Sequence, residues 1–319
     1  MRAAIESRLW LVFSVAAALC WGVWGVLAKF ISSDISPYTN HLLFTVGMLF
    51  TIPFVIRKAT LKTVNLKGIV WGLFAGALAV GGNVAIYQSF SLGGQAAVVV
   101  PVTNLYPLVT ILIALLVLKE KLHWLNGIGI LVVVPAIVLL SGQAQILSDP
   151  ALFFANLGLN AWLLFALVAL LFWGLFSAAQ KVTTNYISAE WSYLSFIVAS
   201  VLITLGFLAF GLISFEFSTQ TLWVGALAGA LNGLGVLASF AAYRAKGKAS
   251  KVTAIAGALQ PVFTIVLAIV FLKETLGGVE LLGIAFAVLG ALLLSAESKP
   301  SRPSTAPEAA NAVTPPLQA

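Results

Sequence analysis

The sequence predicts an all-α integral membrane protein with ten transmembrane helices, built as two inverted five-helix repeats. Three observations predict it: the composition, the placement of the basic residues, and an internal repeat. Hydrophobic residues make up 61% of the 319 positions and charged residues 8%, against about 45–50% and about 25% in soluble domains. One aqueous core cannot hide so much apolar surface. The composition therefore excludes a soluble enzyme, a nucleic-acid-binding domain and a disordered chain.

Turn residues and charges divide the chain into ten apolar runs. Each is close to the length of about 20 residues that crosses a bilayer as a helix. The alternation of a membrane β-barrel is absent, and lipid leaves backbone groups few other partners, so these runs are expected to be helices. The expected spans are 9–31, 38–56, 68–90, 95–118, 124–141, 160–182, 192–213, 221–244, 250–272 and 278–296.

The first span has some features of a secretory signal, because Arg2 and Arg8 precede an apolar run. The run continues to about Ile31, however, and Leu19 before Cys20 is not the small residue that cleavage prefers. We interpret it as a retained first helix. The other end of the chain, 297–319, is rich in Pro, Ala, Ser and Thr, and is expected to be a disordered cytoplasmic tail.

The basic residues indicate the orientation. With a cytoplasmic N-terminus, about 15 of the 17 Lys and Arg residues fall on the inner side, and only Lys29 and Lys273 fall outside. The sequence thus predicts a multi-pass protein of the inner (plasma) membrane with both termini cytoplasmic. The net charge of +7 is then mainly an orientation signal, and no nucleic-acid partner is expected.

The internal repeat decides the architecture. Residues 107–120, PLVTILIALLVLKE, align without gaps to 261–274, PVFTIVLAIVFLKE, with identities that include the scarce residues Pro, Lys and Glu. LCWGVWGVLAK (19–29) likewise matches LFWGLFSAAQK (171–181), and the two offsets, 154 and 152, nearly agree. We therefore expect one five-helix repeat over 9–141 and a second over 160–296.

Five is an odd number, so the second repeat must enter the membrane from the opposite side. Inverted repeats of this kind are a recurring architecture of secondary transporters, with the substrate site near the bilayer midplane between the halves. Two such halves can exchange conformations and open the site alternately to either side.

The duplicated segments also resemble a known family. YQSFSLGGQAAVVVPVTNLYP with LKEKL (87–122), and its second copy AYRAKGKASKVTAIAGALQP with LKETL (241–276), look like the EamA domain of the drug/metabolite transporter superfamily. Two departures are that lysines stand where many members have glycine, at 119 and 273, and that Pro101 has no partner at Ile255. The resemblance implies ten helices and a central cavity lined by helices 1, 3, 4, 6, 8 and 9. It also implies transport of amino acids, purines or other metabolites.

Ionisable residues are missing from the middle of the predicted spans. All ten acidic residues fall in tails, loops or helix ends, whereas a charge at the bilayer centre usually marks function. Lys29 either attracts an anionic substrate group or snorkels to the interface. With one cysteine and two histidines, no metal site and no cofactor are expected.

Amides, phenols and deep tryptophans on the expected cavity helices are the candidate substrate contacts. The alternative for each amide or phenol is an ordinary interhelical hydrogen bond, which contributes about 0.6 kcal/mol. Together with Lys29, the predicted site residues are Trp21, Trp24, Asn83, Tyr87, Gln88, Asn104, Tyr106, Trp173, Gln180, Asn232, Tyr243 and Gln260.

The sequence thus predicts a secondary-active or facilitative transporter that exports or exchanges small organic metabolites, such as amino acids. A sugar-type uptake carrier of the same superfamily is the alternative. A membrane-embedded enzyme is disfavoured because no nucleophile–base or metal–acid motif is present, and a channel because no charged ring or repeated filter is present. A small-molecule substrate and the lipid bilayer are the expected partners, and the choice between monomer and homodimer stays open.

Overall fold

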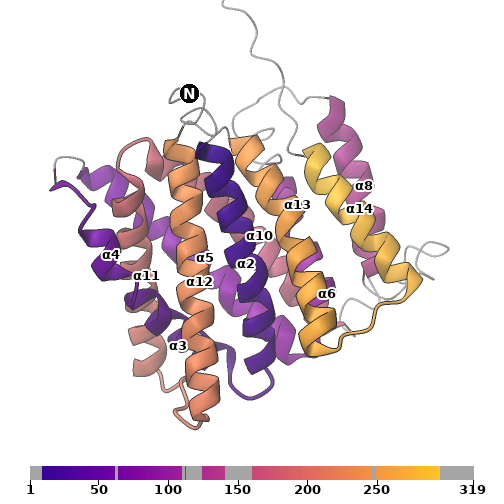
Figure 1. Cartoon of the computed structure of the whole chain (residues 1–319), viewed down its shortest axis with the longest axis horizontal. Coiled ribbons are helices and arrows are strands. Elements are labelled where there is room, and N and C mark those ends of the chain that lie inside the picture. Colours follow the sequence, from indigo (N-terminus) through magenta and orange to yellow (C-terminus); the bar gives the residue numbers. More distant parts are fainter. Residues whose placement is uncertain are drawn as a thin grey trace, which may run out of the picture.

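The computed structural model describes residues 9–61, 64–109, 112, 124–140, 160–245 and 249–294, and they form a bundle of helices (Figure 1). Six helices are long and apolar enough to cross a membrane and three more are shorter. Many of their large apolar side chains face outward, among them Leu131, Phe210 and Trp223. Together with the composition, this confirms an all-helical membrane protein.

The helix bounds agree with most of the expected spans. The sequence repeat matches two stretches of the chain to each other, 9–141 and 160–296. In the first matched stretch the helices are α2 (Leu9–Ile31), α3 (Pro37–Leu49), α4 (Ile52–Ile56), α5 (Leu66–Ser91), α6 (Ala96–Thr103) and α8 (Trp124–Leu140). The second stretch contains α10 (Ala161–Thr184), α11 (Ala189–Ala209), α12 (Thr219–Arg244), α13 (Ala249–Leu267), the π-helix η3 (Ala268–Leu272) and α14 (Gly278–Leu294).

Two expected spans are not single helices. The span 38–56 is interrupted at Phe50 and Thr51, where α3 ends and α4 begins with Pro53 in its first turn. Proline disfavours a helical residue before it and removes a donor, which favours a break. The span 95–118 is helical to Thr103, turns, and becomes helical again from Pro107. Apart from residue 112, its part from 110 onward lies outside the described residues, as does the predicted tail 297–319.

Equivalent helices begin with equivalent caps. Ser36 accepts a hydrogen bond from the backbone N–H of Thr39 at the start of α3, and Ser188 caps α11 in the same way. Asn65 and Ser218 cap α5 and α12. Such side chains satisfy N–H groups that have no partner within the helix. The spacings, 152 between the serines and 153 between the other caps, match the repeat offset.

The same offset relates the contacts between helices. Five close approaches of a glycine on one stretch to the other stretch have a counterpart with the roles exchanged. The pairs are Gly22 on Phe263 with Gly174 on Val109, Gly72 on Ser195 with Gly225 on Leu43, Gly76 on Phe196 with Gly229 on Phe44, Gly82 on Trp173 with Gly235 on Trp21, and Gly129 on Leu294 with Gly283 on Leu140. The two stretches are therefore similar in packing as well as in sequence.

The order in which residues along one helix contact residues along another gives the relative direction of the two helices. Along α5, Gly72 and Gly82 approach Thr183 and then Trp173 on α10, so these helices are antiparallel. Helices α2 and α5 run in the same direction, because the Ser91 hydroxyl near the end of α5 donates to the carbonyl of Ser32 just after α2. The first helices of the two stretches, α2 and α10, consequently run in opposite directions. Helices α8 and α14 pair at one side of the bundle (Figure 1).

The glycine contacts between α3 and α12 predict a sensitive position. A Cβ at Gly229 would collide with the backbone of Phe44, and backbone cannot rotate away. We expect Gly229→Ala to lower the free energy of unfolding by about 1–3 kcal/mol, measured by denaturation in micelles.

The control is Gly206→Ala on α11, where nothing lies within 4 Å of the added methyl group. It should be neutral, or should stabilise the helix by about 0.5–1 kcal/mol. Equal losses in both variants would contradict close packing at Gly229.

Candidate functional site: a cavity between the two halves

A cavity of about 650 Å³, counting the part open to solvent, lies between the two matched stretches. Its walls come from α2, α5 and the residues after α6 on one side, and from α10, α11, α12 and α13 on the other. Because both halves contribute to its walls, this cavity is the candidate functional site.

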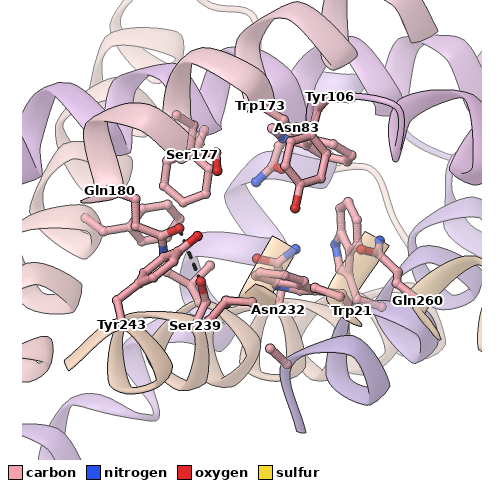
Figure 2. Close-up of a pocket in the computed structure, with 18 residues that line it drawn as sticks. Trp21, Asn83, Tyr106, Trp173, Ser177, Gln180, Asn232, Ser239, Tyr243 and Gln260 are labelled. Atoms are coloured by element: carbon pink, nitrogen blue, oxygen red, sulfur yellow. Dashed lines mark hydrogen bonds between the residues drawn. The ribbon is translucent and has the colours of Figure 1, made fainter. Parts of the chain in front are cut away.

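Nine of the thirteen predicted site residues line this cavity. In Figure 2, Gln180 on α10 and Ser239 and Tyr243 on α12 lie close together near one end, and Trp21 and Gln260 lie near the other. That these residues bind substrate stays a prediction. The nine are Trp21, Trp24, Asn83, Tyr106, Trp173, Gln180, Asn232, Tyr243 and Gln260.

The position of each lining residue follows from helical spacing. Trp173, Ser177 and Gln180 are separated by four and three residues on α10, and Asn232, Ser239 and Tyr243 by seven and four on α12. Spacings of three, four and seven put side chains on one face of a helix. In Figure 2, Ser239 lies opposite Gln180, and its hydroxyl donates a hydrogen bond of 3.2 Å to the Gln180 side-chain carbonyl.

Aromatic rings in contact with one another form the closed end of the cavity. The Trp24 ring lies 5.8 Å from the Trp173 ring and 6.2 Å, edge to face, from the Tyr87 ring. The Trp24 indole N–H also points to the Tyr87 hydroxyl at 3.4 Å. Trp24 and Tyr87 are almost fully buried, so this layer separates the cavity from the far end of α2 and α5.

Four predicted site residues do not line the cavity. Tyr87 lies behind Trp24, and Gln88 is on another face of α5. Asn104 is buried where α6 ends, and its side-chain amide donates to the carbonyl of Val100 at 2.9 Å. The Lys29 side chain extends to the C-terminal end of α5. Helical spacing alone does not say which face of a helix meets a cavity.

Lys29 belongs to a group of polar contacts at the end of the bundle where α2 and α5 end. Its ammonium group donates to the carbonyl of Phe90 at 3.0 Å. Nearby, the two carboxylate oxygens of Glu274 accept hydrogen bonds of 2.8 Å from the backbone N–H groups of Ala96 and Ala97. Glu274 comes from the second stretch and the two alanines from the first, so this contact links the halves.

Local geometry explains the Glu274 contact. The chain leaves η3 through Lys273, whose left-handed backbone (φ 57°) reverses its direction. Gln95 at the start of α6 makes no side-chain cap of its own. The first N–H groups of a helix have no intrahelical partner and carry partial positive charge, so a carboxylate there is favourable.

Several lining residues were not predicted from the sequence. Ser177 could have been found, since it lies on the same face of α10 as Trp173 and Gln180. Phe196 comes from α11, a helix outside the set that the resemblance implies. Small and apolar lining residues such as Ala79 and Val252 have no sequence signal that separates them from ordinary packing positions. Among the described residues, no group of His, Cys, Asp or Glu could hold a metal ion.

Known proteins give the family. The model of the EamA-like transporter family matches residues 8–142 and again 160–296. The chain belongs to the EamA-like transporter family. The resemblance stated from the duplicated motifs is thereby confirmed, and the two matches indicate duplicated halves.

Two individual similarities add to this family membership. The Methanocaldococcus jannaschii protein named Uncharacterized protein MJ1333.1 is 24% identical over 131 residues, which are 41% of this chain and 95% of that protein. It is about as long as one matched stretch of this family member. A solved structure described as "Crystal structure of protein" has a TM-score of 0.60 at 19% identity, over 88% of this chain and 94% of that one. This second likeness supports the fold alone.

Thiol labelling tests the cavity. In a Cys20→Ala background, which removes the single native cysteine, we expect Ser177→Cys to react with a small water-soluble thiol reagent on the order of tenfold faster than Ser200→Cys. Reaction requires a thiolate reached by water, and Ser177 lines the cavity whereas Ser200 is fully buried and does not. Equal labelling rates for the two variants in purified protein would mean that water does not reach the cavity.

Proposed function

We propose that this transporter is a secondary-active or facilitative carrier that moves small organic metabolites, such as amino acids or related solutes, by alternating access. Its ten spans would form two inverted five-helix repeats, with both termini on the cytoplasmic side of the cell membrane. It would export or exchange its substrate and have no enzymatic activity. One observation carries the proposal: a cavity lies between two matched stretches, and it is closed at one end.

The exchanged glycine contacts and the opposite directions of α2 and α10 support an inverted repeat. In an inverted repeat each half can adopt the conformation that the other now has, which exposes the same site to the other side. The basic-residue distribution supports a cytoplasmic start for α2. The cavity reaches Tyr243 and Val252, near the end of the bundle at which α2 and α13 begin, so this conformation would face inward.

The closed end supports the same mechanism. The Glu274 carboxylate, the Lys29 ammonium and the Trp24–Tyr87 ring layer all lie between the cavity and the outer side in this orientation. The bonds of Glu274 join the halves through two backbone donors. These bonds would break when the outer side opens, because α6 and the segment after η3 belong to different halves.

Transport in liposomes tests the function. Purified protein should exchange small metabolites, from a broad solute panel, without ATP. Asn83→Ala should lower the flux about tenfold, because losing a hydrogen bond to a buried substrate costs about 1–3 kcal/mol. Asn185→Ala, at the exposed end of α10, is the matched control and should keep the flux. No flux for any solute, or flux that requires ATP, would refute the proposal.

The closure is tested at Glu274. Glu274→Gln removes the charge and one of the two acceptor oxygens, so the outward-facing state should become more populated. In the Cys20→Ala background, Val100→Cys reports the change, since Val100 is fully buried on α6 beside Gly25. We expect labelling several-fold faster with Glu274→Gln and unchanged with Glu280→Gln, the control on α14. Unchanged labelling in both would show that this contact does not hold the outer end closed.

A further inference from the structure

The cavity wall has a distinctive chemistry. None of its eighteen described lining residues carries a formal charge. Seven have aromatic rings, among them Trp21, Trp24 and Trp173, and four have side-chain amides. Aromatic faces favour stacking on flat solutes, and an amide presents a donor and an acceptor side by side.

The four amides have unused hydrogen-bonding capacity. Asn83, Gln180, Asn232 and Gln260 are 2–5% exposed. Gln180 accepts from Ser239, but its Nε2 is buried without a partner. No described residue makes a hydrogen bond to the side chains of Asn83, Asn232 or Gln260. Buried polar groups are normally paired, so these amides are arranged for water or a ligand in the cavity.

The described charged side chains Lys29, Glu274 and Lys181 make their contacts outside the cavity wall. Lys29 and Glu274 bond to backbone groups at the closed end. Lys181 lies over the ring of Tyr243, 5.8 Å from its centre, but is not among the lining residues. Among the side chains that the structure describes, a buried carboxylate or ammonium group on a solute would therefore find no counter-charge in the cavity wall, which is costly.

The helix break beside the cavity offers no substitute. At broken membrane helices, free N–H groups often bind anionic substrate groups. Here the N–H groups of Asn104, Leu105 and Tyr106 donate to carbonyls of the preceding turn, and Pro107 has none. The N–H groups of Leu108 and Val109 donate to Leu105 and Tyr106. A carboxylate thus finds no free backbone donor at this break.

We infer that the cavity takes an uncharged, planar solute that carries amide or lactam groups, and that it excludes solutes with a free carboxylate. The inference rests on the proposed transport function and narrows its substrate class to exclude the amino acids that were named there as examples. The aromatic walls stack on the ring of the solute, and the four amides pair with its own donors and acceptors. Zwitterionic amino acids are disfavoured by the uncharged wall.

Nicotinamide and nicotinate form a matched pair of probes, since they differ in an amide against a carboxylate on the same ring. L-Phenylalanine is the zwitterionic probe. Binding is measured on purified full-length protein by the rise in Tm with ligand concentration, and transport by counterflow in liposomes, with protein-free vesicles subtracted. We expect nicotinamide to bind more than tenfold tighter than nicotinate or phenylalanine. Gln180→Glu, which replaces the free donor by a charge, should weaken nicotinamide binding about tenfold, whereas Glu280→Gln should not change it.

The outcomes separate the two proposals. Nicotinamide binding without counterflow of any solute would support the substrate class and refute transport. Counterflow of phenylalanine or nicotinate at least equal to that of nicotinamide would support transport and overturn the class. Nicotinamide binding that is absent, or that is as strong for nicotinate, also overturns it.

Discussion

The close packing of α12 on α3 and of α5 on α11 is the constraint on which the rest of the structure depends. At Gly229 the backbone of α12 meets the backbone of α3 at Phe44, and at Gly76 α5 meets α11 at Phe196. Inside a bilayer, helices gain little from the hydrophobic effect, so close van der Waals packing at small residues holds them together. These contacts join the first matched stretch to the second. They fix the distance between the helices that face the cavity, among them α2, α5, α10 and α12.

The cavity follows from that spacing. With the outer contacts fixed at glycines, the large rings of Trp21 and Trp173 fill the space between the inner helices, each against a glycine of the other half. Where the rings stop, polar side chains such as Asn83 and Asn232 face the remaining volume. The same tryptophan–glycine contact, with the roles of the two halves exchanged, thus forms part of both walls of the cavity. It also gives the two walls similar size but different polar groups, because Asn83 and Asn232 are not at equivalent positions of the repeat.

The two ends of the cavity differ for a related reason. On α10 and α12, Ser177 and Ser239 lie toward the end of the cavity at Gln180 and Tyr243, away from the closed end. At the positions that the offset relates to them stand Gly25 and Ile86, which pack into the closed end. Glu274 then bonds to the start of α6 across the halves. A sequence repeat with small local differences can therefore hold one end open and the other shut.

The sequence by itself determined the membrane class, the bounds of most helices to within a few residues, the duplication and nine residues of the cavity wall. Composition, capping residues and period are local properties, and they survive in any arrangement of the helices. Only the tertiary structure decided that Lys29 and Asn104 serve the closed end and the helix break, that Phe196 joins the wall, and that Glu274 links the halves. Those outcomes depend on how each helix is rotated about its axis, and rotation is set by the glycine contacts between segments more than a hundred residues apart.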